Sequence, residues 1–443
     1  MTMSIEWITI TMFSSMLFFM MMGLPVAFSC GVTGVIFTAL LQGPAAVNIV
    51  PTRIFGLMTN YLLAAIPLFI FMANLLERGG LIEDIYEMVY HWMGGIKGGV
   101  ASASVMACTL MAAMVGVIGA SEVTMGLIAL PEMLKRRYDK YMAAGSILAG
   151  GTLGILIPPS VMLIVYGMVD NSSIGQLYAG AFVPGFLLAG LFVLYITVRC
   201  YINPVMGPPI PKDERLPWSG KLRKLMPIVP TAILIFLVLG TIVVGIAAPT
   251  EAAGVGCAGA LVIIALRKKL NWQNFVTASE NTFKASAMVL WTMFGANIFV
   301  ALYIMVGGGE FVTRMLTESG LNRWLVLFIM QFILIFLGCF LDWVGIVMLC
   351  VPLFGPIIRT LGFDPIWFGV LFAVNLQMSF LTPPFGYALF YLKSVAPKEI
   401  TTTDIWLAGA PFLGLQFVGL ALCMVFPKII LIAPEIFFRG GAG

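Results

Sequence analysis

Two pairs of consecutive prolines interrupt long apolar stretches of this chain, one in residues 154–160 (GILIPPS) and one in residues 381–386 (LTPPFG). A proline lacks a backbone N–H and clashes with the preceding helical turn, so each pair should unwind its helix. Backbone groups freed inside a membrane are tolerated only where protein or a water-filled cavity surrounds them. Matched breaks in two halves of a chain are the best sequence indication of a transporter's binding site. The proline pairs therefore predict a secondary transporter.

The low polarity of the chain predicts that it lies in a membrane. Hydrophobic residues make up 60% of the 443 residues and charged residues only 10%, with a mean hydropathy of +1.03; ordinary globular chains carry about 25% charged residues. Apolar segments of about 17 to 25 residues recur along the whole length, as helices that cross about 30 Å of hydrocarbon require. Barrel strands are shorter and alternate in polarity. We therefore expect an all-α, multi-pass integral membrane protein with discontinuous helices.

A polar stretch divides the chain in two. Residues 203–225 hold a proline-rich run and five basic side chains: Lys212, Arg215, Lys221, Arg223 and Lys224. Short loops rich in Lys and Arg stay on the cytoplasmic side. We therefore expect a first repeat in residues 1–202, a cytoplasmic linker in residues 203–225 and a second repeat in residues 226–443.

The first repeat is expected to begin outside and to contain five crossings and one hairpin. The crossings are predicted at about 6–22, 24–41, 61–77, 141–169 (broken at the first proline pair) and 176–202. The apolar run at about 98–136, interrupted at 119–122, has cytoplasmic flanks at Lys97 and Lys135. A segment that enters and leaves on one side is a re-entrant hairpin, here an inward one.

The second repeat is expected to have the same order of elements in the opposite orientation. Its crossings are predicted at about 226–247, 250–266, 285–306, 365–392 (broken at the second proline pair) and 404–426, with an outward hairpin at about 324–359 that is broken near 338–342. The result is an inverted repeat with both termini periplasmic. Six of the 24 Lys and Arg residues then lie outside, which agrees with the positive-inside rule: Arg53, Arg314, Arg323, Arg359, Lys428 and Arg439.

Each half is predicted to form a cup in which a hairpin tip faces a broken helix. Free carbonyls suit a hard cation such as sodium, and exposed amides at helix N-termini suit a carboxylate. The expected sodium ligands are Gly119, Ser121, Gly154 and Pro158 in the first cup, and Gly338, Asp342, Thr382 and Pro383 in the second. The expected substrate contacts are Ser160 and Gly386, which lie just beyond the breaks where the second half-helices begin.

Only two ionisable side chains are predicted to lie deep, Glu122 and Asp342, each near a hairpin tip. An ionised side chain at the bilayer centre costs about 2.5 to 3.5 kcal/mol, so such residues are rarely placed there without a role. With no Lys or Arg expected in mid-span, a carboxylate substrate must be held by helix ends, hydroxyls and bound cations. We therefore expect sodium as the coupling ion, with no organic cofactor and no transition metal. Whether Glu122 binds a ligand or faces a cytoplasmic vestibule is left open.

Three segments resemble a known family: residues 150–160 (GGTLGILIPPS), residues 369–381 followed by TPPFG, and residues 23–27 (GLPVA). They are similar to the large membrane subunit of TRAP transporters, the tripartite ATP-independent periplasmic class. The resemblance implies an elevator-type carrier of the bacterial cytoplasmic membrane, with sodium symport. It also implies two partners, a small membrane subunit (Q type) and a periplasmic substrate-binding protein (P type). By similarity, Ser121 and Asp342 occupy hairpin-tip positions that bind sodium or substrate, so the resemblance adds both to the expected substrate contacts. Glu122 and Trp343 depart from the family pattern.

The predicted topology also bears on partners and alternatives. No external loop is long enough to capture a substrate, so a separate receptor is expected, docking near Glu310, Glu318 and Arg323. Amphipathic pieces at 81–92, 272–284 and 310–316 are expected to lie along the lipid interface. The alternatives are a stand-alone sodium- or proton-coupled carboxylate carrier, a passive channel, and an intramembrane aspartyl protease using Asp170 and Asp342. Neither ATP hydrolysis nor nucleic-acid binding is expected, and the chain is predicted not to be an enzyme.

Overall fold

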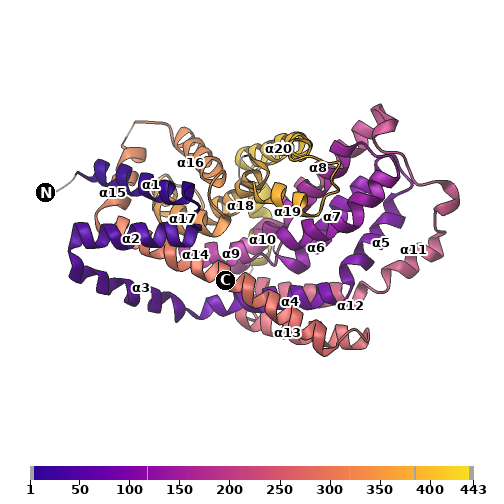
Figure 1. Cartoon of the computed structure of the whole chain (residues 1–443), viewed down its shortest axis with the longest axis horizontal. Helices are drawn as coiled ribbons and strands as arrows, with labels where there is room; N and C mark the ends of the chain where they lie inside the picture. The colour runs from indigo at the N-terminus through magenta and orange to yellow at the C-terminus, as the bar shows by residue number, and fades with distance from the viewer. Residues whose placement is uncertain (1–3, 117, 319, 384–385, 439–443) are drawn as a thin grey trace.

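The computed structural model describes residues 4–116, 118–318, 320–383 and 386–438, and this part of the chain contains helices and turns but no strand (Figure 1). Arg439 and the C-terminal end, whose side of the membrane the sequence predicts, lie outside the described residues, as do Pro384 and Phe385 of the second proline motif. The fold class expected from the sequence, an all-α multi-pass membrane protein, is confirmed.

The part of the chain before the linker forms ten α-helices within the described residues. They are α1 (Ile5–Met21), α2 (Val26–Gln42), α3 (Ile49–Met58), α4 (Ala65–Arg78), α5 (Leu81–Met93), α6 (Gly99–Val115), α7 (Ile118–Lys135), α8 (Lys140–Thr152), α9 (Val161–Asp170) and α10 (Ile174–Ile202).

The remainder of the described chain begins with α11 (Trp218–Leu225) in the linker. It continues with α12 (Val229–Val243), α13 (Pro249–Leu266), α14 (Trp272–Met305), α15 (Gly308–Thr317), α16 (Arg323–Gly338), α17 (Trp343–Thr360), α18 (Pro365–Leu381), α19 (Tyr387–Val395), α20 (Thr402–Val425) and α21 (Lys428–Phe438). Both proline motifs fall between helices, the first between α8 and α9 and the second between α18 and α19.

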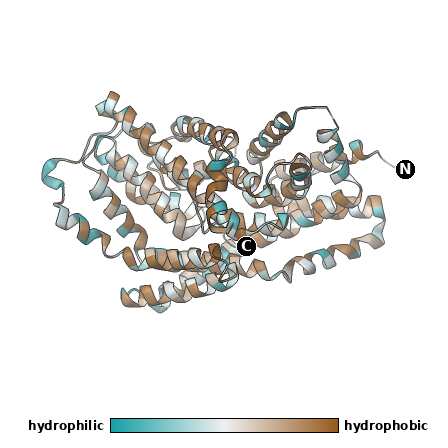
Figure 2. Ribbon diagram, turned by 180° about the vertical axis from the view of Figure 1, so that it is seen from behind, coloured by the Kyte–Doolittle hydropathy of each residue, from teal (hydrophilic) through white to brown (hydrophobic). Residues whose placement is uncertain are grey.

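Six helical segments in the described chain are long and apolar enough to cross a membrane. They are Tyr61–Arg78, which ends in α4, and α10, α13, α14, α17 and α20, with a seventh if α11 and α12, bent by 48°, form one span. The other apolar helices are shorter, because prolines and glycines end them early. Large apolar side chains cover the outer surface, for example Phe236 and Phe332 at 76% and 63% exposure. Figure 2 shows brown, hydrophobic residues along much of the length of these helices.

Four details differ from the sequence-based expectation. The helices α3 and α21 were not expected, and the segment 272–284 is continuous with the following span as the 34-residue α14. The first hairpin turns at Gly116, where φ is +61°, and residues 119–122 already lie in α7. A glycine adopts this left-handed conformation without the Cβ penalty of other residues, so the turn forms there.

Helices from the two halves pack against one another in a reciprocal pattern. In the first group, α2 packs against α14 and α4 against α13; in the second, α9 packs against α17 and α19 against α7, while α8 contacts α20 and α18 contacts α10. Figure 1 shows α4 and α13 side by side along the lower edge, with α8, α18 and α20 above the centre. In each of these pairs one helix precedes the linker and the other follows it.

The linker is attached to the predicted cytoplasmic ends of the first hairpin. Backbone amides of Gly98 and Asp139 donate to the carbonyls of Gly207 and Met206 at 2.8 and 3.1 Å. The guanidinium of Arg136 pairs with the carboxylate of Glu214 at 2.6 Å. These contacts hold residues 203–215 against the loops that enter and leave the hairpin. The linker is thus a packed part of the fold and not a free tether.

Candidate functional site

The first broken helix is enclosed by protein on all sides. After α8 a single 3₁₀ turn (Leu153–Ile155) leads into five non-helical residues, and residues 151–160, including Gly154 and Pro158, are all buried. Ser160 caps α9: its hydroxyl accepts from the amide of Leu163 at 3.4 Å and donates to the carbonyl of Ile155. This hydroxyl already makes two hydrogen bonds. The expected substrate contact at Ser160 would therefore use its backbone and the start of α9.

The first hairpin turn touches this break. A Cβ placed on Gly116 would lie 2.4 Å from the carbonyl oxygen of Pro159, so the tip backbone is in direct contact with the proline pair. Gly119 and Ser121 lie in the first turn and a half of α7 instead of in the tip itself. The hydroxyl of Ser121 is buried and has no hydrogen-bond partner in the part of the chain that the structure describes. Ser121 thus offers an unused oxygen close to the tip.

The second hairpin turn has its own unused oxygen. The helix α16 ends at Gly338, and Asp342 caps α17, with Oδ1 accepting from the amide of Gly345 at 3.3 Å. The other oxygen, Oδ2, is buried, and no described residue forms a hydrogen bond with it. Gly338 packs so tightly on α18 that a Cβ there would lie 2.0 Å from the hydroxyl oxygen of Ser379. The tip of this hairpin therefore touches the helix that leads into the second break.

The second broken helix is more open than the first. Thr382 ends α18 with its hydroxyl donating to the carbonyl of Met378 at 2.7 Å, and Pro383 is exposed. Gly386 begins α19, where a Cβ would lie 2.6 Å from the carbonyl of Phe380. Residues 382 and 383 therefore reach the surface of the described chain, whereas their counterparts at the first break are buried.

Sequence reasoning did not predict the buried polar side chains that lie between α16 and α18. The amide of Asn375 donates to the side-chain and backbone oxygens of Gln331 at 2.6 and 3.0 Å. Three polar atoms between these helices have no hydrogen-bond partner among the described residues: Gln331 Nε2, Asn375 Oδ1 and Ser379 Oγ. Asn375 and Ser379 are four residues apart on one helical face. That spacing of polar residues within an apolar helix was the available signal.

The second broken helix packs against the first hairpin. The helix α19, which follows the second break, lies against α7 of the first hairpin, and a Cβ on Gly119 would meet the ring of Tyr391 at 3.1 Å. Hydroxyl, carbonyl and carboxylate oxygens are the donors that a hard cation prefers. The unpaired oxygens of Ser121 and Asp342 therefore fit the expected ligand chemistry.

The aspartyl-protease alternative is not compatible with this arrangement. Asp170 pairs with the Arg359 guanidinium at 2.9 Å, near the C-terminal end of α17, whereas Asp342 caps the other end of the same helix. A helix of this length separates its ends by about 27 Å. The two carboxylates thus cannot act on one peptide bond.

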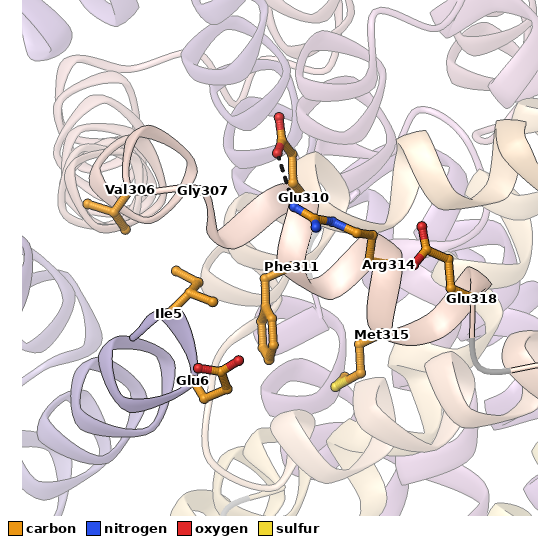
Figure 3. A pocket seen from close by; sticks show the side chains of 9 residues that line it. All are labelled: Ile5, Glu6, Val306, Gly307, Glu310, Phe311, Arg314, Met315 and Glu318. Carbon is orange, nitrogen blue, oxygen red and sulfur yellow. Dashed lines mark ion pairs between the residues drawn. The ribbon is translucent and has the colours of Figure 1, made fainter. Parts of the chain in front are cut away.

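A surface pocket of about 590 Å³ lies between the N-terminal end of α1, the C-terminal end of α14 and the helix α15 (Figure 3). Three of its lining residues are acidic, Glu6, Glu310 and Glu318, and one is basic, Arg314, which lies 3.6 Å from Glu310. Phe311 and Met315 form apolar walls. Arg323, expected beside these acids, instead lies over the rings of Trp324 and Phe363.

The family model and the relatives that match this chain agree on one protein family. The family model described as "Tripartite ATP-independent periplasmic transporter, DctM component" matches residues 13–429. The C4-dicarboxylate TRAP transporter large permease protein DctM of Vibrio cholerae is 31% identical over 95% of this chain and 97% of its own length. The sialic acid TRAP transporter large permease protein SiaM of the same organism is 30% identical over 95% and 96%.

A solved structure has a similar fold. The YdaH transporter of Alcanivorax borkumensis aligns with a TM-score of 0.58 over 90% of each chain, at 16% sequence identity. At this identity the likeness concerns the arrangement of helices alone. The named relatives are transporter permeases, in agreement with the expectation that the chain is not an enzyme.

Proposed function

This chain belongs to the DctM family, the large permease component of TRAP transporters, and we propose that it imports an organic acid by sodium-coupled secondary transport across the bacterial cytoplasmic membrane. The observation that carries the proposal is the pair of unused, buried oxygens of Ser121 and Asp342 beside two broken helices. Buried polar atoms are normally paired, so such atoms indicate a ligand.

An organic acid is the substrate class that suits the site. The relatives are named for C4-dicarboxylates and sialic acid, both of which carry carboxylates. The helices α9 and α19 begin at the two breaks, and their free N-terminal amides attract anions. Ser160 and Gly386 precede these helix starts and present the backbone amides that would receive the carboxylate.

Sodium coupling follows from the charge balance of the site. Glu122 and Asp342 are buried carboxylates, and an anionic substrate adds more negative charge to the same region. Sodium ions held by Gly119, Ser121, Gly154 and Pro158, and by Gly338, Asp342, Thr382 and Pro383, would offset that charge and make substrate affinity depend on sodium. Inward movement of net positive charge gains about 2.3 kcal/mol per 100 mV, so the potential contributes to uptake.

We place the two cups in a mobile transport domain that moves against a scaffold as an elevator. The reciprocal packing of α7 with α19 and of α17 with α9 supports an inverted repeat, since each broken helix packs on the other half's hairpin. The scaffold would contain α2, α4, α13 and α14, which also pack reciprocally. Rigid-body movement of one such bundle past another is a common route to alternating access.

The proposed partners are a small membrane subunit (Q type) and a periplasmic binding protein (P type) that delivers the substrate. With the termini on the periplasmic side, as the sequence predicts, the pocket around Glu310 and Glu318 would face the binding protein. Its three carboxylates and single guanidinium would receive basic side chains. The alternative is a stand-alone carrier that captures its substrate from solution.

Reconstitution into proteoliposomes tests the proposal. Uptake of a candidate dicarboxylate should require an inward sodium gradient and the loaded binding protein, with the small subunit present. Uptake that is equally fast without any binding protein would support the stand-alone carrier, and uptake that is indifferent to sodium would refute the cation cups.

A further inference from the structure

The short linker helix α11 carries an exposed apolar stripe. Trp218, Leu222 and Met226 are spaced by four residues, so they share one side of the helix, and they are 70%, 54% and 71% exposed. A bend of 48° joins α11 to α12, and the two helices together are long and apolar enough to cross a membrane. The stripe therefore lies at the end of a predicted span, where an apolar surface can enter the lipid interface.

A basic side chain lies next to this stripe without an acidic partner. Ser219 and Arg223 are also four residues apart, on the neighbouring side of α11, and both are exposed. Among the described residues, no carboxylate forms an ion pair with Arg223. Residues 215–250 contain no Asp or Glu at all. The guanidinium of Arg223 is therefore available to an anion from outside the chain.

The helix α5 holds α11 by other residues. Lys224 forms an ion pair with Glu87, and the indole N–H of Trp92 donates to the carbonyl of Lys221 at 3.3 Å. The ring of Trp92 also packs edge-on against Trp218. Figure 1 shows the two helices side by side at one end of the molecule. These contacts fix the orientation of α11 and leave Leu222 and Arg223 uncovered.

The end of α13 adds positive charge near the same bend. The guanidinium of Arg267 donates to the carbonyl of Pro227 at 2.5 Å and pairs with Asp84 at 2.6 Å. Its own charge is thus balanced, but the two residues that follow it, Lys268 and Lys269, are exposed. The surroundings of α11 are therefore net positive, and they favour a negatively charged occupant.

We propose that α11 binds an anionic phospholipid of the bilayer, with the headgroup phosphate on Arg223 and Ser219 and an acyl chain along Leu222 and Met226. Guanidinium groups bind phosphates through two parallel hydrogen bonds. Helices that combine a basic flank with an apolar side lie in the membrane interface, and basic segments beside a span attract anionic lipids. A free phosphate would use the guanidinium but not the apolar stripe, so the stripe favours a lipid. The bound lipid would hold the linker at the membrane surface.

Fluorescence quenching by brominated lipids tests this surface. The full-length chain is placed in phosphatidylcholine nanodiscs that contain increasing fractions of brominated phosphatidylglycerol. Because the chain has nine tryptophans, the signal of Trp218 is the difference between wild type and Trp218→Phe. Half-maximal quenching of Trp218 in Arg223→Gln should need about fivefold more phosphatidylglycerol, since one basic group near the surface is lost. Lys135→Gln, an equal charge loss at an exposed residue of α7, is the matched control and should quench as wild type does.

Four results would overturn the proposal. Brominated phosphatidylcholine that quenches Trp218 at the same fractions would show that lipid charge plays no part. Equal half-maximal fractions for wild type and Arg223→Gln would exclude Arg223 as the headgroup ligand. Loss of quenching on addition of inorganic phosphate would assign the site to a free anion, and loss on addition of the small membrane subunit would assign it to a protein. None of these results involves sodium or uptake, so a failure here leaves the proposed function unchanged.

Discussion

The two carboxylate oxygens of Asp342 have different surroundings. Its Oδ1 caps α17, and its Oδ2 is buried with no hydrogen-bond partner within residues 4–116, 118–318, 320–383 and 386–438. Sequence reasoning placed this aspartate at a hairpin tip because it is one of two acids in long apolar runs. It could not assign the two oxygens, because a cap depends on the local backbone and an unpaired atom depends on what packs around it. Ser379 and Asn375 were missed for the same reason.

Substitution of Asp342 separates these two uses. Asp342→Ala removes both the cap and the proposed ligand, whereas Asp342→Asn keeps a capping oxygen and removes the charge. We expect both variants to lose sodium-dependent uptake in proteoliposomes. Asp342→Ala should also destabilise α17 by about 0.5 to 2 kcal/mol, the usual cost of losing an N-cap. Full uptake by Asp342→Asn would show that the residue is only a cap.

Asp170 is another buried carboxylate, and it forms an ion pair with Arg359 away from the two predicted cups. The Asp170 side chain is only 2% exposed and also accepts from the hydroxyl of Ser172, whereas Arg359 is 46% exposed. Arg359→Met should therefore leave a buried carboxylate short of its strongest partner and destabilise the protein by about 1 to 3 kcal/mol. Thermal unfolding in detergent measures the effect. The double variant with Asp170→Asn should regain most of the loss, and a double variant as unstable as the single one would contradict the assignment.

At the scale of elements, the main features are the helix breaks at the two proline motifs, the first hairpin turn and the long helix α14. Both proline motifs end a helix as the sequence predicted, because the missing N–H and the ring clash act locally. The first hairpin turn was expected at 119–122 but lies at Gly116, since several glycines were available and packing against Pro159 selects among them. The continuity of α14 was also missed, because amphipathic and apolar windows can share one helix.

Proline substitution tests whether the first break is needed. Pro158→Ala restores one backbone donor and removes one ring clash, so residues near 156–158 should become more helical and their carbonyls less available. We expect a weaker sodium affinity for uptake, with insertion unaffected. Pro204→Ala, in the linker, is the control for proline removal in general. A sodium titration of Pro158→Ala that superposes on wild type would count against a role of the break in cation binding.

At the scale of the whole molecule, the two halves cross so that each broken helix packs on the other half's hairpin. This arrangement places Gly119 against Tyr391 although they are far apart in sequence. It also leaves the acidic pocket of α1, α14 and α15 at one end of the long axis, well removed from α5 and α11 at the other (Figures 1 and 3). Delivery of substrate and contact with the linker would therefore use different ends of the protein.

Charge reversal in this pocket tests where the binding protein docks. Glu310→Lys changes the pocket, with its three acids and one base, toward neutrality and removes the partner of Arg314. We expect receptor-dependent uptake to need a several-fold higher receptor concentration, with sodium affinity unchanged. Glu399→Lys makes the same charge change at an exposed residue on the predicted cytoplasmic side and should have no effect. Equal losses in both variants would indicate a general folding defect.

The sequence by itself determined the membrane setting, the helical fold class and the positions of the two breaks. These depend on composition and on proline geometry, which act over a few residues and need no knowledge of distant contacts. Only the tertiary structure decided which buried oxygens remain unpaired, which helix each hairpin packs against, and that Glu122 faces the end of α8 through the gap left by Gly151. Those facts depend on side chains brought together from distant parts of the chain, and the packing of whole helices sets their partners.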